Sequence, residues 1–361
     1  MDKIWKPLEL VKVTAGYLAE KRIPNPRLDA ELLLLEILGL KRRVDLYAGF
    51  EREISGKELA SFRELIRRRA AREPVSRILA RREFMGITFR VTPDVLSPRP
   101  ETELLVEAAI EAASPARPPA EKTPGEDWYG DQAALPDELV SLLDAYAGDI
   151  DDAEALDPDL PAGPSPAAGP PLGPATAKKK AGKRLSAKPG LRLLDLGTGG
   201  GCIAVALAAS LPGAMVVAID ASAKALAVAK RNAAEAGVAK RIDFRRGDWF
   251  GGCRKGEVFD AILANPPYLV EGDPDIWPEV SRHDPPAALY AGRDGLDCYR
   301  RIIPDSPNWL AADGRIFFEV GAGQAAAVGR LLENAGYRAV STIRDYGGTE
   351  RVVTGTAPAA L

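Results

Sequence analysis

The chain has 361 residues, of which 46% are hydrophobic, and a formal net charge of −3. It is long enough for two ordinary domain cores, and no apolar run approaches the roughly 20 residues that a membrane-spanning helix needs. A single histidine and three widely spaced cysteines argue against multi-histidine metal sites, His-based triads and thiol redox motifs. We therefore expect no metal site, and a cytoplasmic location because residues 1–10 lack the apolar segment of a signal peptide.

The charge is unevenly distributed. Residues 1–100 hold 21 Lys and Arg against 14 Asp and Glu, a surplus of +7, so the remainder must carry −10. A basic front half can meet an acidic partner such as RNA or a ribosome-associated protein. An excess of this size is also typical of an ordinary solvated surface, so both interpretations stay open.

Residues 5–72 show helical periodicity in three blocks. Apolar residues recur at helical spacing in residues 8–18, 28–38 and 59–66, and Ser55 stands where it can cap the third helix. We expect residues 1–80 to form a small helical bundle that docks the substrate and carries no chemistry of its own.

Residues 81–113 are expected to connect this bundle to the next domain. Residues 84–96 change to two-residue alternation, which predicts a β-hairpin, and prolines then hold the chain extended until a helix begins near Thr102. Arg99 and Glu101 lie in this rigid segment. They can line a substrate site at the domain junction, or they can simply cap the helix.

Residues 114–188 differ in composition from the rest of the chain. Twelve of the 30 prolines lie within residues 115–174, residues 121–159 hold 13 acidic residues against one lysine, and residues 178–188 add six positive charges. So few apolar side chains predict a mostly disordered insert, with a short helix at residues 139–146. The lysine run is consistent with a solvated linker or with a regulatory or nucleic-acid-binding tail.

Strand and helix patterns alternate from residue 191 onward. A strand at residues 191–195 leads through a glycine-rich turn into a helix at 202–211, and a second strand ends at Asp220. This βαβ order predicts an α/β fold with a mostly parallel sheet in residues 189–361. The further elements expected are a helix at 222–236, strands at 242–245 and 259–264, a helix at 299–310, a strand at 315–320, a helix at 324–335, and strands at 339–343 and 351–353.

Asn265-Pro266-Pro267-Tyr268 follow directly after the buried strand expected at residues 259–264. At the carboxyl end of such a strand, the Asn265 amide, the Pro266 carbonyl and the Tyr268 ring face one crevice. Two carbonyl oxygens can accept both hydrogens of a planar NH2 group while the ring packs against its face. Taken alone, the same residues are equally consistent with a turn that ends a strand.

The glycine-rich turn narrows the choice of ligand. An acid at the end of the second strand also occurs in dinucleotide-binding folds, but the pyrophosphate-binding pattern GxGxxG needs glycine at position 202, where Cys202 stands. Residues 195–201 (DLGTGGG) instead resemble the glycine loop of class I S-adenosylmethionine-dependent methyltransferases. Amino-group methyltransferases of that class carry NPPY after the fourth strand, where it stands here.

Seven motifs in order resemble the PrmC/HemK family, the peptide chain release factor N5-glutamine methyltransferases. They are FMG with FRV at residues 84–91, PRPETELLVE at 98–107, DLGTGGG at 195–201, GDWF at 247–250, NPPY at 265–268, GRDGLDCYRRII at 292–303 and RDYGGTERVV at 344–353. The resemblance implies a class I methyltransferase fold, S-adenosyl-L-methionine as the cofactor, and a class I release factor whose Gly-Gly-Gln loop supplies the substrate glutamine.

The resemblance also implies roles for individual residues. The glycine loop passes under the methionine and ribose of the cofactor, Asp220 accepts hydrogen bonds from the ribose, and Asp248 and Trp249 flank the adenine. Asp195 either orders the loop or takes the cofactor's amino group through water. The loop residues are Gly197, Thr198, Gly199, Gly200 and Gly201.

The substrate site is implied by the same resemblance. Asn265 and Pro266 hold the substrate amide and aim its nitrogen at the methyl group, while Tyr268 stacks on the amide plane. Asn265 also borders the cofactor. Pro267, Arg99 and Glu101 complete the expected substrate site.

Two other classes of protein share part of this pattern. A DNA or RNA adenine-N6 methyltransferase uses NPPY after base flipping, but the acidic balance and the lack of a basic target-recognition segment argue against it. A catalytically silent binding protein with a methyltransferase fold is the second, and the intact loop, Asp220 and NPPY argue against that. We expect a monomeric enzyme without direct DNA binding.

Overall fold

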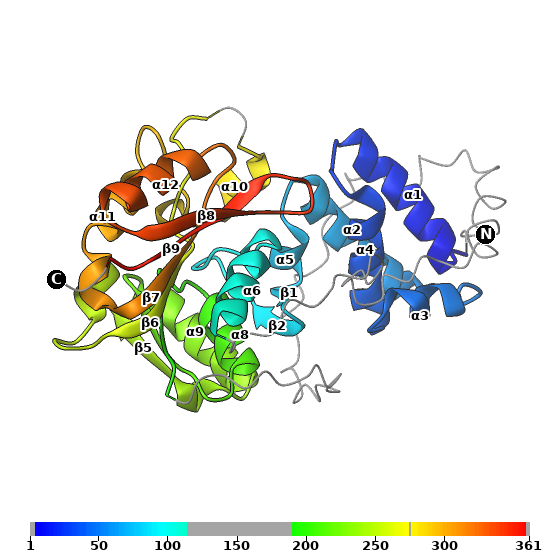
Figure 1. Cartoon of the computed structure of the whole chain (residues 1–361). Coiled ribbons are helices and arrows are strands. Elements are labelled where there is room, and N and C mark those ends of the chain that lie inside the picture. Colours follow the sequence, from blue (N-terminus) through cyan, green and yellow to red (C-terminus); the bar gives the residue numbers. More distant parts are fainter. Residues whose placement is uncertain (1–3, 114–189, 274–275, 359–361) are drawn as a thin grey trace, which may run out of the picture. The chain divides into compact units, whose positions relative to one another are not determined.

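The computed structural model describes residues 4–113, 190–273 and 276–358 (Figure 1). They form two compact units, the first ending at Val75 and the second beginning at Ser76. The insert expected at residues 114–188, with its lysine run and its short helix, lies outside the described residues.

The first unit is a helical bundle. Its helices are α1 (Pro7–Glu20), α2 (Pro26–Leu38), α3 (Arg43–Ala48) and α4 (Gly56–Ala70). Leu10, Leu33 and Phe62 are fully buried in its core. Helix α4 begins at the expected cap, because the Ser55 hydroxyl accepts the Glu58 N–H while the Glu58 carboxylate accepts the Ser55 N–H. Helix α3 was not expected, since six residues are too few to show a helical period.

The second unit is built on a seven-stranded sheet with the order β5-β4-β3-β6-β7-β9-β8. The strands are β3 (Arg192–Leu196), β4 (Met215–Asp220), β5 (Ile242–Arg246), β6 (Phe259–Ala264), β7 (Leu310–Glu319), β8 (Arg338–Arg344) and β9 (Glu350–Thr356). Strands β5, β4, β3, β6 and β7 are parallel, and β9 is antiparallel to both of its neighbours. The sheet confirms the expected class I methyltransferase fold.

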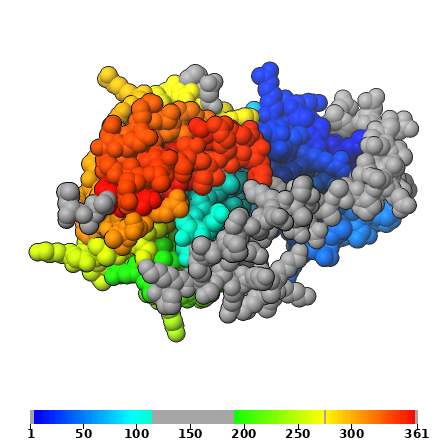
Figure 2. All heavy atoms as spheres, in the orientation of Figure 1, coloured from blue at the N-terminus to red at the C-terminus, as the bar shows by residue number. Residues whose placement is uncertain are grey.

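Helices cover both faces of this sheet. They are α6 (Glu101–Ala113), α8 (Cys202–Ser210), α9 (Ala223–Glu235), α11 (Asp297–Ile302) and α12 (Ala325–Asn334). Two further helices are α5 (Val75–Ile78), which spans the division between the units, and α10 (Pro278–His283). Short 3-10 helices occupy Ala239–Arg241, Trp249–Gly252, Pro286–Ala288 and Ser306–Trp309. Successive residues of β3 join different apolar clusters, Leu193 with α6 and α8 and Leu194 with α11 and α12, because side chains alternate across a sheet. In the space-filling view α12, β8 and β9 form a continuous orange and red surface (Figure 2).

The β-hairpin does not span residues 84–96 as expected. It consists of β1 (Arg81–Phe84) and β2 (Ile87–Arg90), joined by a two-residue turn at Met85 and Gly86, whose φ angles are +50° and +69°. Polar residues in β1 hide the alternation there, and Pro93 cannot continue a strand ladder beyond β2. Phe84 and Phe89 still face inward, with ring centroids 5.9 Å apart.

The helix expected at residues 299–310 is also wrong in its extent. Helix α11 ends at Ile302, because Pro304 interrupts the chain with a residue that has no N–H to donate. The apolar residues that follow belong to a 3-10 turn and to β7, which begins at Leu310 instead of residue 315. None of the helices in the described ranges has the length and apolar character needed to cross a bilayer.

Candidate active site

The glycine loop and the acid at the end of β4 lie together, as the motifs predict. One Asp220 oxygen accepts the Gly199 N–H at 2.8 Å, and its other oxygen accepts the Ser222 N–H at 2.8 Å. Asp220 therefore orders the loop that connects β3 to α8. Each carboxylate oxygen keeps a second lone pair for a ligand hydroxyl.

Asp195 is completely buried behind this loop. Its Oδ2 accepts the Thr198 hydroxyl at 2.6 Å and the Ala204 N–H at 3.2 Å, whereas Oδ1 has no hydrogen-bond partner among the described residues. Burial raises the pKa of Asp195 to about 7. One oxygen thus orders the loop, and the other remains available to a positively charged or hydrogen-bonding ligand.

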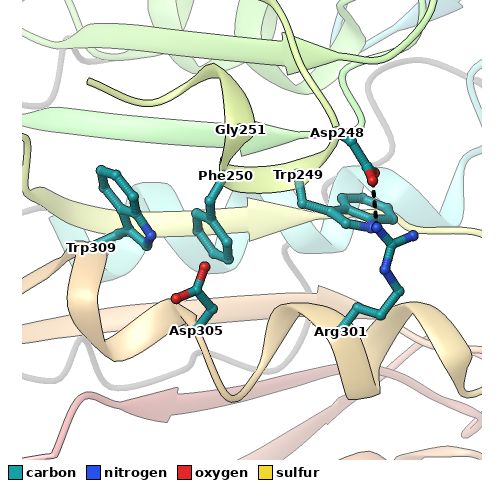
Figure 3. Close-up of a pocket in the computed structure, with 7 residues that line it drawn as sticks. All are labelled: Asp248, Trp249, Phe250, Gly251, Arg301, Asp305 and Trp309. Atoms are coloured by element: carbon teal, nitrogen blue, oxygen red, sulfur yellow. Dashed lines mark hydrogen bonds and ion pairs between the residues drawn. The ribbon is translucent and has the colours of Figure 1, made fainter. Parts of the chain in front are cut away.

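The residues after β5 form a second part of the site (Figure 3). Asp248, Trp249 and Arg301 border a cavity of about 370 Å³, and Arg301 pairs with Asp248 across it. A Cβ atom at Gly197 would lie 3.4 Å from the Trp249 ring, so the indole packs directly against the glycine loop. Both members of the Asp248 pair are exposed, so a ligand can replace this weak interaction.

A larger cavity, of about 630 Å³, opens at the carboxyl end of β6. Asn265, Pro266, Tyr268 and Arg99 all line it, which brings four of the expected substrate residues together. Pro267 and Glu101 are not among its lining residues. Glu101 is the first residue of α6. Burial is the main cause that raises the pKa values of Tyr268 and Glu319, and the negative charge of Glu101 adds to both shifts.

An ion pair that the motifs did not reveal holds Arg99 at the cavity. Asp284 accepts a hydrogen bond from Arg99 at 3.1 Å and one from Arg77 at 2.7 Å. The Arg77 and Asp284 side chains are each only 5% exposed. Arg77 and Asp284 belong to no motif of recognisable spacing, so the ion pair between them is visible only in the folded structure.

Tyr268 is fixed at both ends. Its hydroxyl lies 3.4 Å from Glu319 Oε1, and its backbone carbonyl accepts a hydrogen bond from Gln324 Nε2 at 2.9 Å. Burial keeps the hydroxyl protonated, because it raises the pKa of Tyr268 well above its ordinary value. A Cβ atom at Gly295 would lie 2.2 Å from the same carbonyl, so only glycine fits there.

Two buried polar residues stand behind Asn265. Its Nδ2 donates to the Thr102 hydroxyl at 3.1 Å, and that hydroxyl donates to Glu319 Oε2 at 2.5 Å. Burial raises the pKa of Glu319 to about 7. A lone carboxylate at the end of the apolar strand β7 was the signal in the sequence that could have identified Glu319.

Comparisons with known proteins identify two matching domain models and several curated relatives. Residues 9–79 match the PrmC N-terminal domain, and residues 182–280 match the methyltransferase small domain. The release factor glutamine methyltransferase of Geobacter sulfurreducens is 35% identical over 354 residues, covering 98% of this chain and 97% of the relative. Its namesake from Chlorobaculum tepidum is 35% identical, with 97% of each chain covered, and that from Rhodopirellula baltica 31%, with 98% and 97% covered.

The chain belongs to the release factor glutamine methyltransferase family. Membership confirms the family that the seven motifs indicated, and it makes the chain a methyltransferase that uses S-adenosyl-L-methionine. Among solved structures, TrmN from Thermus thermophilus is 27% identical, with a TM-score of 0.34 and coverage of 47% of this chain and 44% of that one.

Proposed function

We propose that this family member methylates the side-chain nitrogen (N5) of the glutamine in the Gly-Gly-Gln loop of class I release factors. The observation that carries the proposal is the cavity at the end of β6, where Asn265, Pro266 and Tyr268 meet. These groups can recognise both hydrogens and the flat face of a primary amide. The names of relatives that align along nearly the whole chain support the same substrate.

The cofactor supplies a methyl group on a positively charged sulfur, which is already activated for transfer. One structural observation supports a binding site for this cofactor. Asp195 Oδ1 is buried and has no hydrogen-bond partner among the described residues. We propose that this oxygen receives the cofactor's amino group, directly or through water, and that Asp220 receives its ribose hydroxyls. The glycine loop from Gly197 to Gly201 would lie beneath the methionine and ribose, and Asp248 and Trp249 would flank the adenine.

The protein's main task is to orient a weak nucleophile. Resonance delocalises the lone pair of an amide nitrogen, so close alignment with the methyl carbon matters more than a general base. Asn265 Oδ1 and the Pro266 carbonyl accept the two N–H groups and stabilise the positive charge that develops on nitrogen. The new N–CH3 bond forms as the S–CH3 bond breaks, and one proton then leaves the nitrogen for water.

The remaining groups act around this centre. Tyr268 packs against the amide plane, while Arg99, Pro267 and Glu101 contribute to the binding of the substrate loop. We propose that the helical bundle of residues 1–80 docks the release factor. We further propose that the enzyme acts as a monomer in the cytoplasm, where release factors work, and does not bind DNA directly.

Mass spectrometry tests the proposal. The full-length protein is incubated with S-adenosyl-L-methionine and a purified class I release factor, and the peptide that contains the Gly-Gly-Gln loop is sequenced. The proposal predicts one added methyl group on that glutamine, and none on a release factor in which the glutamine is replaced by glutamate. Methylation at any other residue would contradict it.

A further inference from the structure

We infer that Thr102 and Glu319 are positioning residues, which fix the Asn265 amide so that its oxygen faces the substrate. The inference rests on the proposed function for the identity of the substrate. The orientation itself follows from the hydrogen bonds of the protein alone.

An asparagine amide can take two orientations that differ only in the exchange of its oxygen and nitrogen. Here Nδ2 of Asn265 lies 3.1 Å from Thr102 Oγ1, and Oδ1 has no hydrogen-bond partner within the described residues. The substrate site needs the oxygen, because the NH2 group of a primary amide requires an acceptor. The orientation that the structure shows is therefore the productive one.

The Thr102 hydroxyl selects this orientation because it carries only one hydrogen. Above the pKa of Glu319 its side chain is a carboxylate that can only accept, so the Thr102 hydrogen points to Glu319 Oε2, 2.5 Å away, and Thr102 presents lone pairs alone to Asn265. If the amide were reversed, Oδ1 would face another acceptor with no hydrogen between them. Both groups would then be left unsatisfied next to the cavity, which is strongly disfavoured.

Glu319 can hold the Thr102 hydrogen because its own position is fixed. It is 1% exposed, and its backbone carbonyl accepts the Tyr299 hydroxyl at 2.7 Å. Its second oxygen lies 3.4 Å from the Tyr268 hydroxyl, so the same carboxylate contacts Tyr268 directly and Asn265 through Thr102. Thr102 is buried as well, 1% exposed, in the first turn of α6.

This arrangement indicates that the proline-rich segment before α6 helps to hold Thr102 in place. The N–H of Thr102 donates to the Arg99 carbonyl at 3.1 Å, which ties the first turn of α6 to the segment that lines the cavity. Thr102 and Glu319 do not line the cavity themselves. They act on the substrate through Asn265, and we therefore call them positioning residues.

Kinetics with matched variants tests the inference. Thr102→Val keeps the shape of the side chain and removes the hydroxyl, and we expect kcat to fall by about 10–100-fold while the affinity for S-adenosyl-L-methionine stays within about two-fold. Thr102→Ser restores the hydroxyl and should recover most of the lost rate. Thr354→Val is the control, because Thr354 is buried in β9 and its hydroxyl has no partner among the described residues.

Nuclear magnetic resonance of the free protein tests the orientation without any substrate. The side-chain NH2 of Asn265 should exchange its bonded hydrogen about 10-fold faster in Thr102→Val than in the wild type or in Thr102→Ser. At a pH above the pKa of Glu319, Glu319→Gln should have the same effect, since a neutral amide can donate to Thr102 as well as accept from it, whereas the wild-type carboxylate only accepts. If Thr102→Val does not fold, this second variant carries the test.

The two measurements separate this inference from the proposed function. Wild-type kcat in Thr102→Val, or unchanged exchange of the Asn265 NH2 in both variants, would overturn the positioning role. A wild-type enzyme that does not methylate release factors would overturn the proposed function. In that event, the exchange measurement still decides whether Thr102 and Glu319 fix the amide.

Discussion

The side-chain nitrogen of Asn265 lies 3.1 Å from the hydroxyl oxygen of Thr102, although 163 positions separate the two residues. The bond joins the end of β6 to the first turn of α6, which come from opposite sides of residues 114–189 in the chain. The site is therefore complete only when α6 has packed beside the sheet. Its chemistry depends on tertiary structure as much as on the NPPY motif.

Asn265→Ala should abolish methyl transfer and leave cofactor binding largely intact. The substitution removes the acceptor that aims the substrate nitrogen, and losses of about 10²–10³-fold in kcat are typical when one such group is deleted. Isothermal titration with S-adenosyl-L-methionine and a methylation assay measure the two effects separately. An equal loss of both would show that Asn265 is mainly a cofactor or folding residue.

Gly295→Ala should disturb the same site through the backbone of Tyr268. The new Cβ would lie 2.2 Å from the Tyr268 carbonyl oxygen and 2.4 Å from Gln324 Nε2, so the backbone of Tyr268 has to move. We expect at least a ten-fold lower kcat and a loss of about 2 kcal/mol or more in the free energy of unfolding.

Gly348→Ala is the matched control for this glycine. Gly295 and Gly348 both have positive φ, +72° and +80°, but a Cβ at Gly348 would meet nothing within 4 Å. The control therefore carries only the backbone strain, of about 1 kcal/mol, and should keep its activity. Similar activities in the two variants would show that crowding at Tyr268 does not matter.

Elements with a strong local signal were predictable from the sequence. The apolar run that forms β6 and the acid that ends β4 at Asp220 have the residues expected of them. Parallel strands of an α/β sheet end at one edge, so the motifs at those ends could be assigned to one site. The two-residue turn at Met85 and Gly86 was misjudged because the polar residues of β1 show no alternation.

Interactions across long stretches of chain were not predictable. Thr102 and Glu319 are 217 positions apart, and Arg77 and Asp284 are 207 positions apart. Periodicity reports only which face of its own element a residue occupies. The groups that support the site therefore became visible only in the folded chain.

Arg77→Met should strongly destabilise the second unit. It would leave the buried Asp284 carboxylate with Arg99 alone, whose side chain is 35% exposed. Removing one partner of a buried pair typically lowers the free energy of unfolding by about 3–5 kcal/mol. Urea denaturation measures this loss, and Arg300→Met, which breaks an exposed pair with Asp294, should show little change. Equal effects of the two substitutions would contradict the account.

Glu319 should make the protein less stable as the pH rises from about 4.5 to about 7. Burial raises the pKa of Glu319 from 4.5 to about 7, so the folded state keeps a proton that the unfolded state releases in this window. The shift corresponds to about 3 kcal/mol. Arg99 opposes it and Glu101 adds to it.

Chemical denaturation of the wild type and of Glu319→Gln between pH 4 and pH 8 checks this effect. The free energy of unfolding of the variant, relative to the wild type, should increase across the window, because glutamine does not titrate. The pKa of Asp195 is also raised, to about 7, so the free energy of unfolding of the Glu319→Gln variant should still decline in part as the pH rises. A constant difference between the two proteins at all pH values would refute the role assigned to Glu319.

The most direct test of the central claim is a competition for labelled methyl groups. The full-length protein receives S-adenosyl-L-methionine with a labelled methyl group, together with a class I release factor and duplex DNA. The account predicts label on the glutamine of the Gly-Gly-Gln loop and none on adenine. Label on the DNA, with the release factor glutamine unmodified, would contradict it.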